Sequence, residues 1–222
     1  MQENGTRGNS LFGATNEARF WDRIARKYAK DPIADIAGYE QTLDRTRKLL
    51  DSNDTVFEFG CGTGTTALRL APFVARIVAT DISGEMIAIA REKREAEGHA
   101  HIDFQVATPD SVSWPEGPFD AVLSFNVLHL VAARKAALHG VHRLLKPGGL
   151  FITKTPCLKE MNLLVHIGIP VMRLFGKAPY VSVFDADELE REIADAGFEI
   201  VARERHASRG KDTRPFFVAR KS

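Results

Sequence analysis

Cysteine is scarce in this sequence, and its scarcity excludes one class of protein. Only Cys61 and Cys157 occur among the 222 residues, and Cys61 lies inside a glycine-rich turn. Small secreted domains that are held together by disulfides carry more cysteines at regular spacings. We therefore expect no disulfide framework, a reducing compartment and a cytoplasmic location.

Long apolar runs are also missing. The longest one, 161–172, is too short to span the hydrocarbon core of a bilayer, and it contains His166 and Pro170. Residues 1–15 are polar and rich in glycine, without the apolar core of a signal or transit peptide. The sequence thus predicts no stable membrane insertion, and it predicts a mobile tail over 1–15.

The chain has no excess of charge of either sign. Its 30 Lys and Arg residues and 29 Asp and Glu residues leave a net charge of +1, so no global field draws it to nucleic acid or to an anionic membrane. A local basic cluster comprises Arg203, Arg205, Arg209, Lys211 and Arg214. A solvated hairpin explains this cluster more simply than a nucleic-acid surface, so we expect no nucleic-acid partner.

Short apolar runs typical of buried strands recur along the chain, at 56–59, 77–80, 102–106, 121–124, 150–154, 198–204 and 215–219. Helical stretches separate most of them, which predicts an α/β, Rossmann-like doubly wound sheet of seven strands, mostly parallel. No helix separates the last two runs, so we expect them to form an antiparallel C-terminal hairpin. A helix over about 132–146 is expected to end at Gly148 and Gly149, because Pro147 prevents its continuation.

The remaining segments predict caps on a single domain. Residues 16–222 suit one α/β domain by length, with an N-terminal helical cap over 16–50 in which Phe20, Ile24 and Tyr28 form one apolar stripe. Residues 157–184 form an insertion whose apolar residues recur every four positions. This pattern predicts an apolar cap, which either covers an apolar acceptor or packs against the sheet.

The stretch VFEFGCGTG, 56–64, places a glycine turn directly after a predicted strand. In open α/β sheets such a turn lies at the ligand-binding edge, and Asp81 ends the next strand about 20 residues later, where an acid binds ribose hydroxyls. A dinucleotide turn needs its third glycine one position later than Gly64. Glu58 also suits a cation better than a pyrophosphate. The pattern favours S-adenosyl-L-methionine over a nicotinamide cofactor.

Four segments in order, VFEFGCGTG, ATDIS, FDAVLSFNVLHLV and LLKPGGLFITK, resemble the class I S-adenosylmethionine-dependent methyltransferases. The resemblance covers about 55–154, and the whole chain is most similar to the small-molecule branch that includes ubiquinone and menaquinone C-methyltransferases. It implies a set of cofactor-binding residues: Glu58, Gly60, Gly62 and Gly64 around the methionine part, with Cys61 in the same turn, Asp81 at the ribose, Ile82 and Met86 at the adenine face, and Asn126 near the methionine end.

The loop after the third strand departs from the pattern of this family. The family commonly has Gly-Asp-Ala there, with the acid on the adenine amino group, whereas this chain has VATPDSV. Thr108 stands in the place of that acid, followed by Pro109 and Asp110. We expect these three residues at the adenine.

Methyl transfer depends on alignment of the reactants, and it needs a base only when the nucleophile begins protonated. His129 and His166 are the candidate bases, and the alternative for His129 is a structural histidine held by backbone hydrogen bonds. Tyr28 belongs to a KY pair similar to that of relatives whose first helix roofs the cofactor. It either faces the sulfonium or belongs to the core stripe. No cysteine or carboxylate set completes a metal site around the paired histidines.

The predicted function is methyl transfer from S-adenosyl-L-methionine to a small, lipophilic acceptor, namely a quinol, thiol, phenol or amine. Fold and cofactor do not fix the acceptor. Two alternatives stay open: a nucleic-acid methyltransferase, and a non-catalytic module that binds S-adenosylmethionine. The oligomeric state is open as well.

Overall fold

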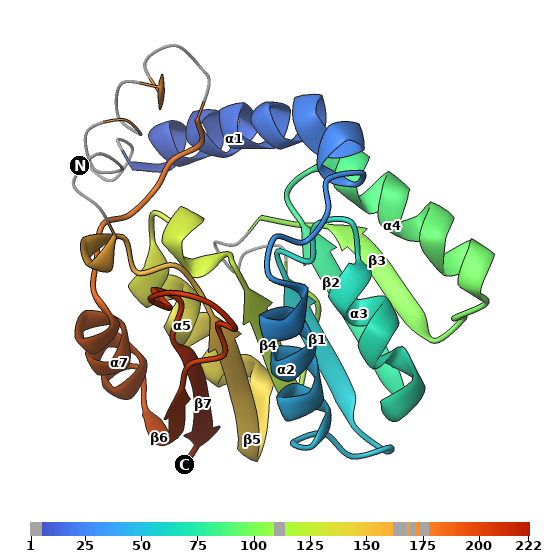
Figure 1. Cartoon of the computed structure of the whole chain (residues 1–222), viewed down its shortest axis with the longest axis vertical. Helices are drawn as coiled ribbons and strands as arrows, with labels where there is room; N and C mark the ends of the chain where they lie inside the picture. The colour runs from blue at the N-terminus through green and yellow to red at the C-terminus, as the bar shows by residue number, and fades with distance from the viewer. Residues whose placement is uncertain (1–5, 109–113, 162–167, 169–171, 174–177) are drawn as a thin grey trace, which may run out of the picture.

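A mixed sheet of seven strands runs through the centre of the computed structural model, which describes residues 6–108, 114–161, 168, 172–173 and 178–222 (Figure 1). The strands are β1 (Thr55–Phe59), β2 (Arg76–Asp81), β3 (Ile102–Val106), β4 (Phe119–Phe125), β5 (Leu145–Lys154), β6 (Phe198–Glu204) and β7 (Phe216–Lys221). Their order is β3-β2-β1-β4-β5-β7-β6. The first five are parallel, whereas β7 is antiparallel to both β5 and β6. The predicted fold class and the antiparallel hairpin are confirmed.

Helices cover both faces of this sheet. They are α1 (Thr6–Tyr28), α2 (Ile36–Arg47), α3 (Thr65–Leu70), α4 (Gly84–Glu97), α5 (Arg134–Leu144) and α7 (Ala186–Asp195), with short 3-10 turns η1 (Ala71–Phe73), η2 (Leu128–Leu130) and η3 (Leu158–Glu160). Successive strand residues point to opposite faces, so Phe57 and Phe151 pack with α5 and α7, whereas Val56 and Ile152 pack with α2, α3 and α4. Because both faces are buried, these strands are continuous apolar runs, which made them recognisable in the sequence.

Helix α1 lies across the carboxyl ends of the parallel strands (Figure 1). Trp21 packs against a small core that includes Met86 of α4. Oδ1 of Asp22 accepts hydrogen bonds from Ser83 Oγ at 2.6 Å and from the N–H of Glu85 at 3.1 Å. These contacts attach α1 to the start of α4, where it covers the edge of the sheet.

The two predicted caps are only partly described by the structure. Helix α1 begins at Thr6 rather than near residue 16, so it includes much of the segment expected to be a tail, while residues 1–5 lie outside the described residues. In the 157–184 insertion, 162–167, 169–171 and 174–177 lie outside them too. In the described remainder, the N–H of Tyr180 donates to the carboxylate of Glu17 at 3.1 and 3.2 Å, which connects this segment to α1.

The predicted end of the helix before β5 was wrong. Helix α5 ends at Leu144, and Leu145 already belongs to β5 and pairs with Phe119 of β4. The next pair is Leu150 of β5 with Ala121 of β4. Residues 146–149 of β5 therefore bulge out opposite one residue of β4, Asp120. Gly148 has φ +76° within that bulge. The Pro-Gly-Gly stretch therefore marks an irregular strand and not the end of a helix.

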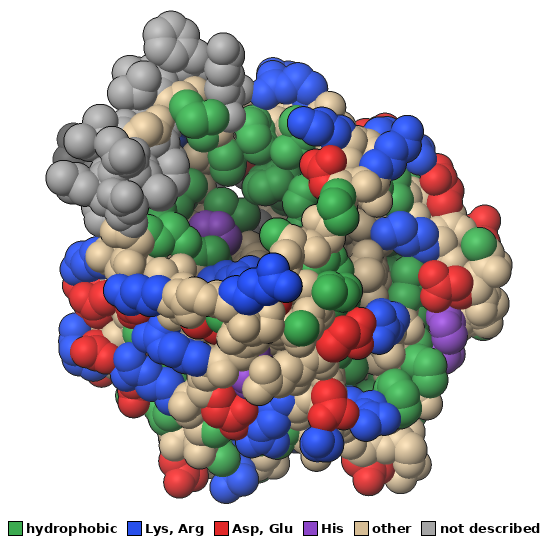
Figure 2. All heavy atoms as spheres, viewed as in Figure 1, with side chains coloured by type: hydrophobic (Ala, Val, Ile, Leu, Met, Phe, Trp, Pro, Cys, Tyr) green, Lys and Arg blue, Asp and Glu red, His purple; other side chains and the backbone are tan. Residues whose placement is uncertain are grey.

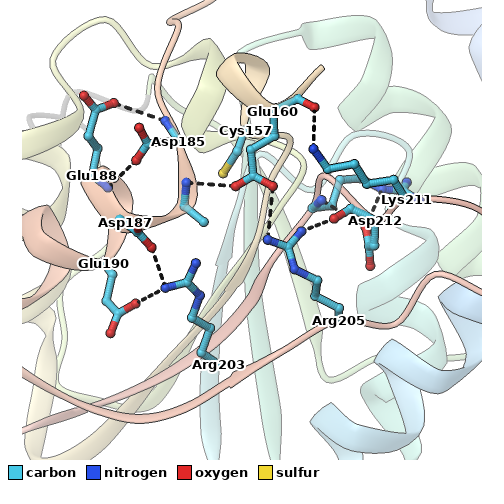
Figure 3. Close-up of polar contacts among 12 residues, drawn as sticks. Cys157, Glu160, Asp185, Asp187, Glu188, Glu190, Arg203, Arg205, Lys211 and Asp212 are labelled. Carbon is cyan, nitrogen blue, oxygen red and sulfur yellow. Dashed lines mark hydrogen bonds and ion pairs between the residues drawn. The ribbon is translucent and has the colours of Figure 1, made fainter. Parts of the chain in front are cut away.

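Most of the C-terminal basic cluster is paired with acids (Figure 3). Arg203 donates to Asp187 and Glu190 of α7 at 2.7 Å. Arg205 lies 3.1 Å from Glu160, and Lys211 donates to the carbonyl oxygen of the same Glu160 at 3.2 Å. These bonds hold the segment between β6 and β7 against η3 and α7.

Candidate functional site

A cavity of about 740 Å³ opens at the carboxyl edge of the sheet. Figure 2 shows the hollow in the front face, with hydrophobic side chains above it. The glycine turn after β1 and the ends of β2, β4 and β5 line it from below, and α1 lines it from above with Glu17, Trp21 and Tyr28. The strand ends predicted to carry the site therefore meet in one place, as expected for a parallel sheet.

The three glycines of the turn have different reasons to be glycine. All have left-handed backbone angles, with φ +69° at Gly60, +54° at Gly62 and +75° at Gly64. A Cβ on Gly60 would lie 2.2 Å from Val127, and one on Gly64 would lie 2.6 Å from the ring of Phe104, whereas one on Gly62 would meet nothing within 4 Å. Gly62 also lines the cavity. The first and third glycines thus serve packing, and Gly62 exposes its backbone to the cavity.

Asp81 connects the end of β2 to this turn. Its carboxylate accepts the N–H of Gly62 and the N–H of Ser83, each at 2.9 Å. Burial is the main cause that raises the pKa of Asp81. Asp81 is not the N-cap of α4, because Ser83 takes that position and its side chain accepts from Met86 N. Asp81 lines the cavity, where a carboxylate is available to hydroxyl donors.

Glu58 is a buried acid without a partner for one of its oxygens. Its exposed fraction is 2%, it lines the cavity, and Oε2 has no hydrogen bond within the described part of the chain. Burial, followed by the charge of Asp81, raises the pKa of Glu58 to about 8. A buried carboxyl group with a free oxygen is costly unless something pairs with it. A cationic ligand group in the cavity would supply that pairing.

The residues predicted at the adenine are only partly placed. Ile82, Met86 and Thr108 line the cavity, and Met86 is 2% exposed. Pro109 and Asp110 lie outside the described residues, so their contact with an adenine stays a prediction. Cys61 also lines the cavity, and its thiol is buried, which raises its pKa well above the ordinary range.

Tyr28 and Asn126 lie on opposite sides of the cavity. Tyr28 is 51% exposed but lines the cavity, and partial burial and the charge of Asp81 raise the pKa of its hydroxyl. Asn126 has φ +59°, a left-handed angle that asparagine tolerates better than most residues. Its N–H donates to Lys154 O at 2.7 Å, which places the residue at the cavity wall.

Of the two candidate bases, the structure describes only His129, which is not among the described residues that line the cavity. Nδ1 of His129 lies 2.9 Å from Thr155 Oγ1, and that oxygen also accepts the N–H of His129. Burial lowers the pKa of His129 to about 4, so the imidazole is neutral at physiological pH. Its neighbours Leu130 and Val131 line the cavity. His166 lies outside the described residues.

The cavity residues that sequence reasoning missed include Trp114, Lys154 and Arg214. Trp114 packs on the rings of Phe57 and Phe59, with centroids 5.6 and 5.1 Å apart. Lys154 ends β5 at the same edge as Asp81 ends β2, and this position could have identified it as a site residue.

In the described ranges, no three His, Cys, Asp or Glu side chains gather as they would around a metal ion. In the same ranges, no helix has both the length and the apolar character to cross a bilayer.

Residues 57–153 match the family described as methyltransferase domain. A ubiquinone biosynthesis O-methyltransferase of Rhizobium rhizogenes is 29% identical over 152 residues, which is 67% of this chain and 61% of that protein. The corresponding protein of Chelativorans sp. is 29% identical over 190 residues, 84% of this chain and 70% of that protein. Among solved structures, magnesium protoporphyrin IX methyltransferase from Synechocystis PCC 6803, with bound SAH, has a TM-score of 0.70 and 19% identity, over 96% of this chain and 100% of that one. The chain spans less than two thirds of the length of the Rhizobium relative.

Proposed function

We propose that the chain is a class I S-adenosylmethionine-dependent methyltransferase, which transfers the methyl group of this cofactor to a small, lipophilic acceptor. One observation carries the proposal. The carboxylates of Glu58 and Asp81 line the cavity beside a glycine turn, and Oε2 of Glu58 has no partner among the described residues. Such a wall suits a ligand with ribose hydroxyls and a cationic group, which would favour the ionised form of Glu58, better than it suits a pyrophosphate.

The described residues fit S-adenosyl-L-methionine. Glu58 would accept from its ammonium group, Gly62 leaves room for it, Asp81 would accept from the ribose, and Ile82 and Met86 would contact the adenine. The sulfonium makes the attached methyl group an electrophile. Tyr28 and the rest of α1 exclude water from above, which strengthens the electrostatic contacts within the cavity.

The acceptor we propose is a quinol, thiol, phenol or amine with an apolar body. Support comes from the wall of Trp21, Trp114, Leu130 and Val131 and from the ubiquinone relatives. Since the family needs chiefly alignment of the reactants, no side chain must act as a base. If a proton has to be removed, His129 is neutral at physiological pH but a weak base, because its pKa is about 4.

Two alternatives have less support. A nucleic-acid methyltransferase would use the basic cluster, but Arg203 and Arg205 are paired with Asp187, Glu190 and Glu160. A non-catalytic binding module would bind the cofactor without turnover. We keep a cytoplasmic location within the proposal, because Cys61 and Cys157 are both buried and unpaired.

Isothermal titration with S-adenosylhomocysteine, with NADH as the control, tests the cofactor. We expect micromolar binding of the first and none of the second. Turnover is then tested with quinols, thiols, phenols and amines, following S-adenosylhomocysteine release. Absence of cofactor binding refutes the proposal, and binding without turnover across the panel favours the non-catalytic module.

A further inference from the structure

Lys154 is a buried cation at the cavity wall. The residue is 6% exposed and lines the cavity from the end of β5. Its Nζ donates to Thr42 Oγ1 of α2 at 3.0 Å, and among the described residues it has no ion pair within 4.0 Å. An ammonium group has three donors, and a neutral hydroxyl satisfies only one. Burial lowers the pKa of Lys154, as expected for a charge without a close counterion.

The nearby carboxylates are already committed to other donors. Asp35 accepts from Gly38 N, Ser208 N and Ser208 Oγ. Asp212 accepts from the N–H groups of His206, Ala207 and Arg214. These bonds shape the ends of α2 and the segment between β6 and β7, so the two acids stabilise backbone rather than pair directly with Lys154.

A second cation shares this side of the cavity. Arg214 lines both the main cavity and an adjoining hollow of about 600 Å³, and Asn126 also lines both. The Nε atom of Arg214 lies 3.9 Å from Oδ1 of Asp212, at the limit of an ion pair. The hollow is further lined by Arg209 and Lys211. Figure 2 shows Lys and Arg side chains gathered below the opening, over the region where Figure 1 draws the segment between β6 and β7.

Lys154 and Arg214 thus bring two cations to one side of the cavity, where Asp35 also contributes to the lining. Glu58 and Asp81 lie at the ends of β1 and β2, whereas Lys154 lies at the end of β5, beyond β4 in the sheet. We propose that Lys154 and Arg214 form an anion subsite that holds a carboxylate group of the acceptor. This inference rests on the proposed function, and it narrows the acceptor to one with an apolar body and an acidic end. Nζ would donate its remaining hydrogens to the carboxylate, and the guanidinium of Arg214 would bind it from the open side.

The test uses two probes that share a catechol ring: protocatechuate, which is an anion, and its neutral methyl ester. Their binding to the full chain loaded with S-adenosylhomocysteine is measured by calorimetry. We expect the acid to bind roughly tenfold or more tightly than the ester. Lys154→Met should remove most of this preference and leave the affinity for the ester unchanged. Arg214→Gln should reduce the preference for the acid by a smaller factor than Lys154→Met does, because the side chain of Arg214 is more exposed than that of Lys154.

Lys146→Met is the matched control. Lys146 lies on the same strand, β5, but pairs with Asp120 at 2.6 Å at the opposite end, so its removal should not change the preference for the acid. Thermal melting of each variant excludes unfolding, and Lys154→Gln repeats the test with a side chain that still donates to Thr42.

Three outcomes overturn the inference. The first is equal binding of acid and ester, including no binding of either. The second is unchanged preference in both Lys154 variants. The third is loss of S-adenosylhomocysteine affinity in Lys154→Met with the acid preference intact, which would assign the lysine to the cofactor. Failure of the wild type to bind S-adenosylhomocysteine refutes the proposed function instead, and the same acid and ester comparison on the free protein then still decides the subsite.

Discussion

The backbone N–H of Gly62 donates a 2.9 Å hydrogen bond to Oδ2 of Asp81. The middle glycine of the turn after β1 and the last residue of β2 thus form one unit, although 19 positions separate them. Asp81 both orients the turn and presents a carboxylate to the cavity. A change at either residue therefore tests the same assignment.

Replacing Asp81 by alanine should weaken S-adenosylhomocysteine binding by roughly 1–3 kcal/mol, because a partly buried acceptor of hydrogen bonds is lost. Isothermal titration measures this directly. Asp120→Ala is the control, since Asp120 accepts from Thr55 N at the opposite end of the sheet. Unchanged affinity in Asp81→Ala would disprove the ribose assignment.

Replacing Gly62 by valine should abolish cofactor binding in a protein that still folds. The new side chain would enter open space in the cavity, and its left-handed backbone should cost about 1–3 kcal/mol of stability. Gly98→Val is matched to it: Gly98 has φ +77° and nothing within 4 Å of its Cβ, but it caps the end of α4. If both variants lose stability alike and Gly62→Val still binds, the cofactor does not lie at the turn.

The buried carboxyl group of Glu58 should make the ligand-free protein sensitive to pH. Its pKa is raised from its ordinary value near 4.5 to about 8, so the folded state keeps a proton that the unfolded state releases in this window. The free energy of unfolding attributable to Glu58 therefore falls as the pH rises from about 4.5 to about 8. Glu58→Gln removes this titration. The free energy of unfolding of the variant minus that of the wild type, measured with urea, should therefore increase as the pH rises through this window. Parallel pH profiles of the two proteins would contradict the burial of an unpaired carboxyl group.

Weakening the attachment of α1 should loosen the roof of the cavity. Asp22→Ala removes the acceptor for Ser83 Oγ and Glu85 N, and we expect about tenfold weaker S-adenosylhomocysteine binding and faster proteolysis within α1. Arg26→Ala, on the same helix, breaks exposed ion pairs with Glu92 and Glu85 and should have little effect. Equal behaviour of the two variants would argue against a role for α1 as a roof.

The parts of the fold that the sequence predicted are those set by local pattern. The parallel strands were recognisable because both of their faces are buried, and the turn because its glycines and Asp81 occur in a fixed order. The prediction for the end of α5 was wrong because Pro147 and Gly148 indicate an interruption of regular structure, but they do not indicate whether the helix or the strand contains it. The interruption lies in β5, where the strand bulges after Leu145 pairs with Phe119 of β4. This pairing is a tertiary contact, which the local pattern does not contain.

The burial of the charged side of the cavity could not be predicted for a similar reason, although the strand-end position of Lys154 could. In the sequence, Lys154 resembles an ordinary solvated residue at the end of a strand, and its buried Nζ donates to Thr42, 112 positions away. The environment of His129 depends on Thr155, whose hydroxyl contacts the imidazole although α5 and β5 lie between the two residues in the sequence. Pattern locates the strand ends, whereas long-range contacts determine which of the residues there are buried.

The order of strands at one side of the sheet also constrains how the protein folds. β7 follows β6 in the sequence but lies between β5 and β6, so β6 joins the sheet only through β7. Until β7 docks, β5 has an unpaired edge, and that edge ends at Lys154. The acceptor side of the cavity is therefore completed by contacts of high sequence separation, which form slowly.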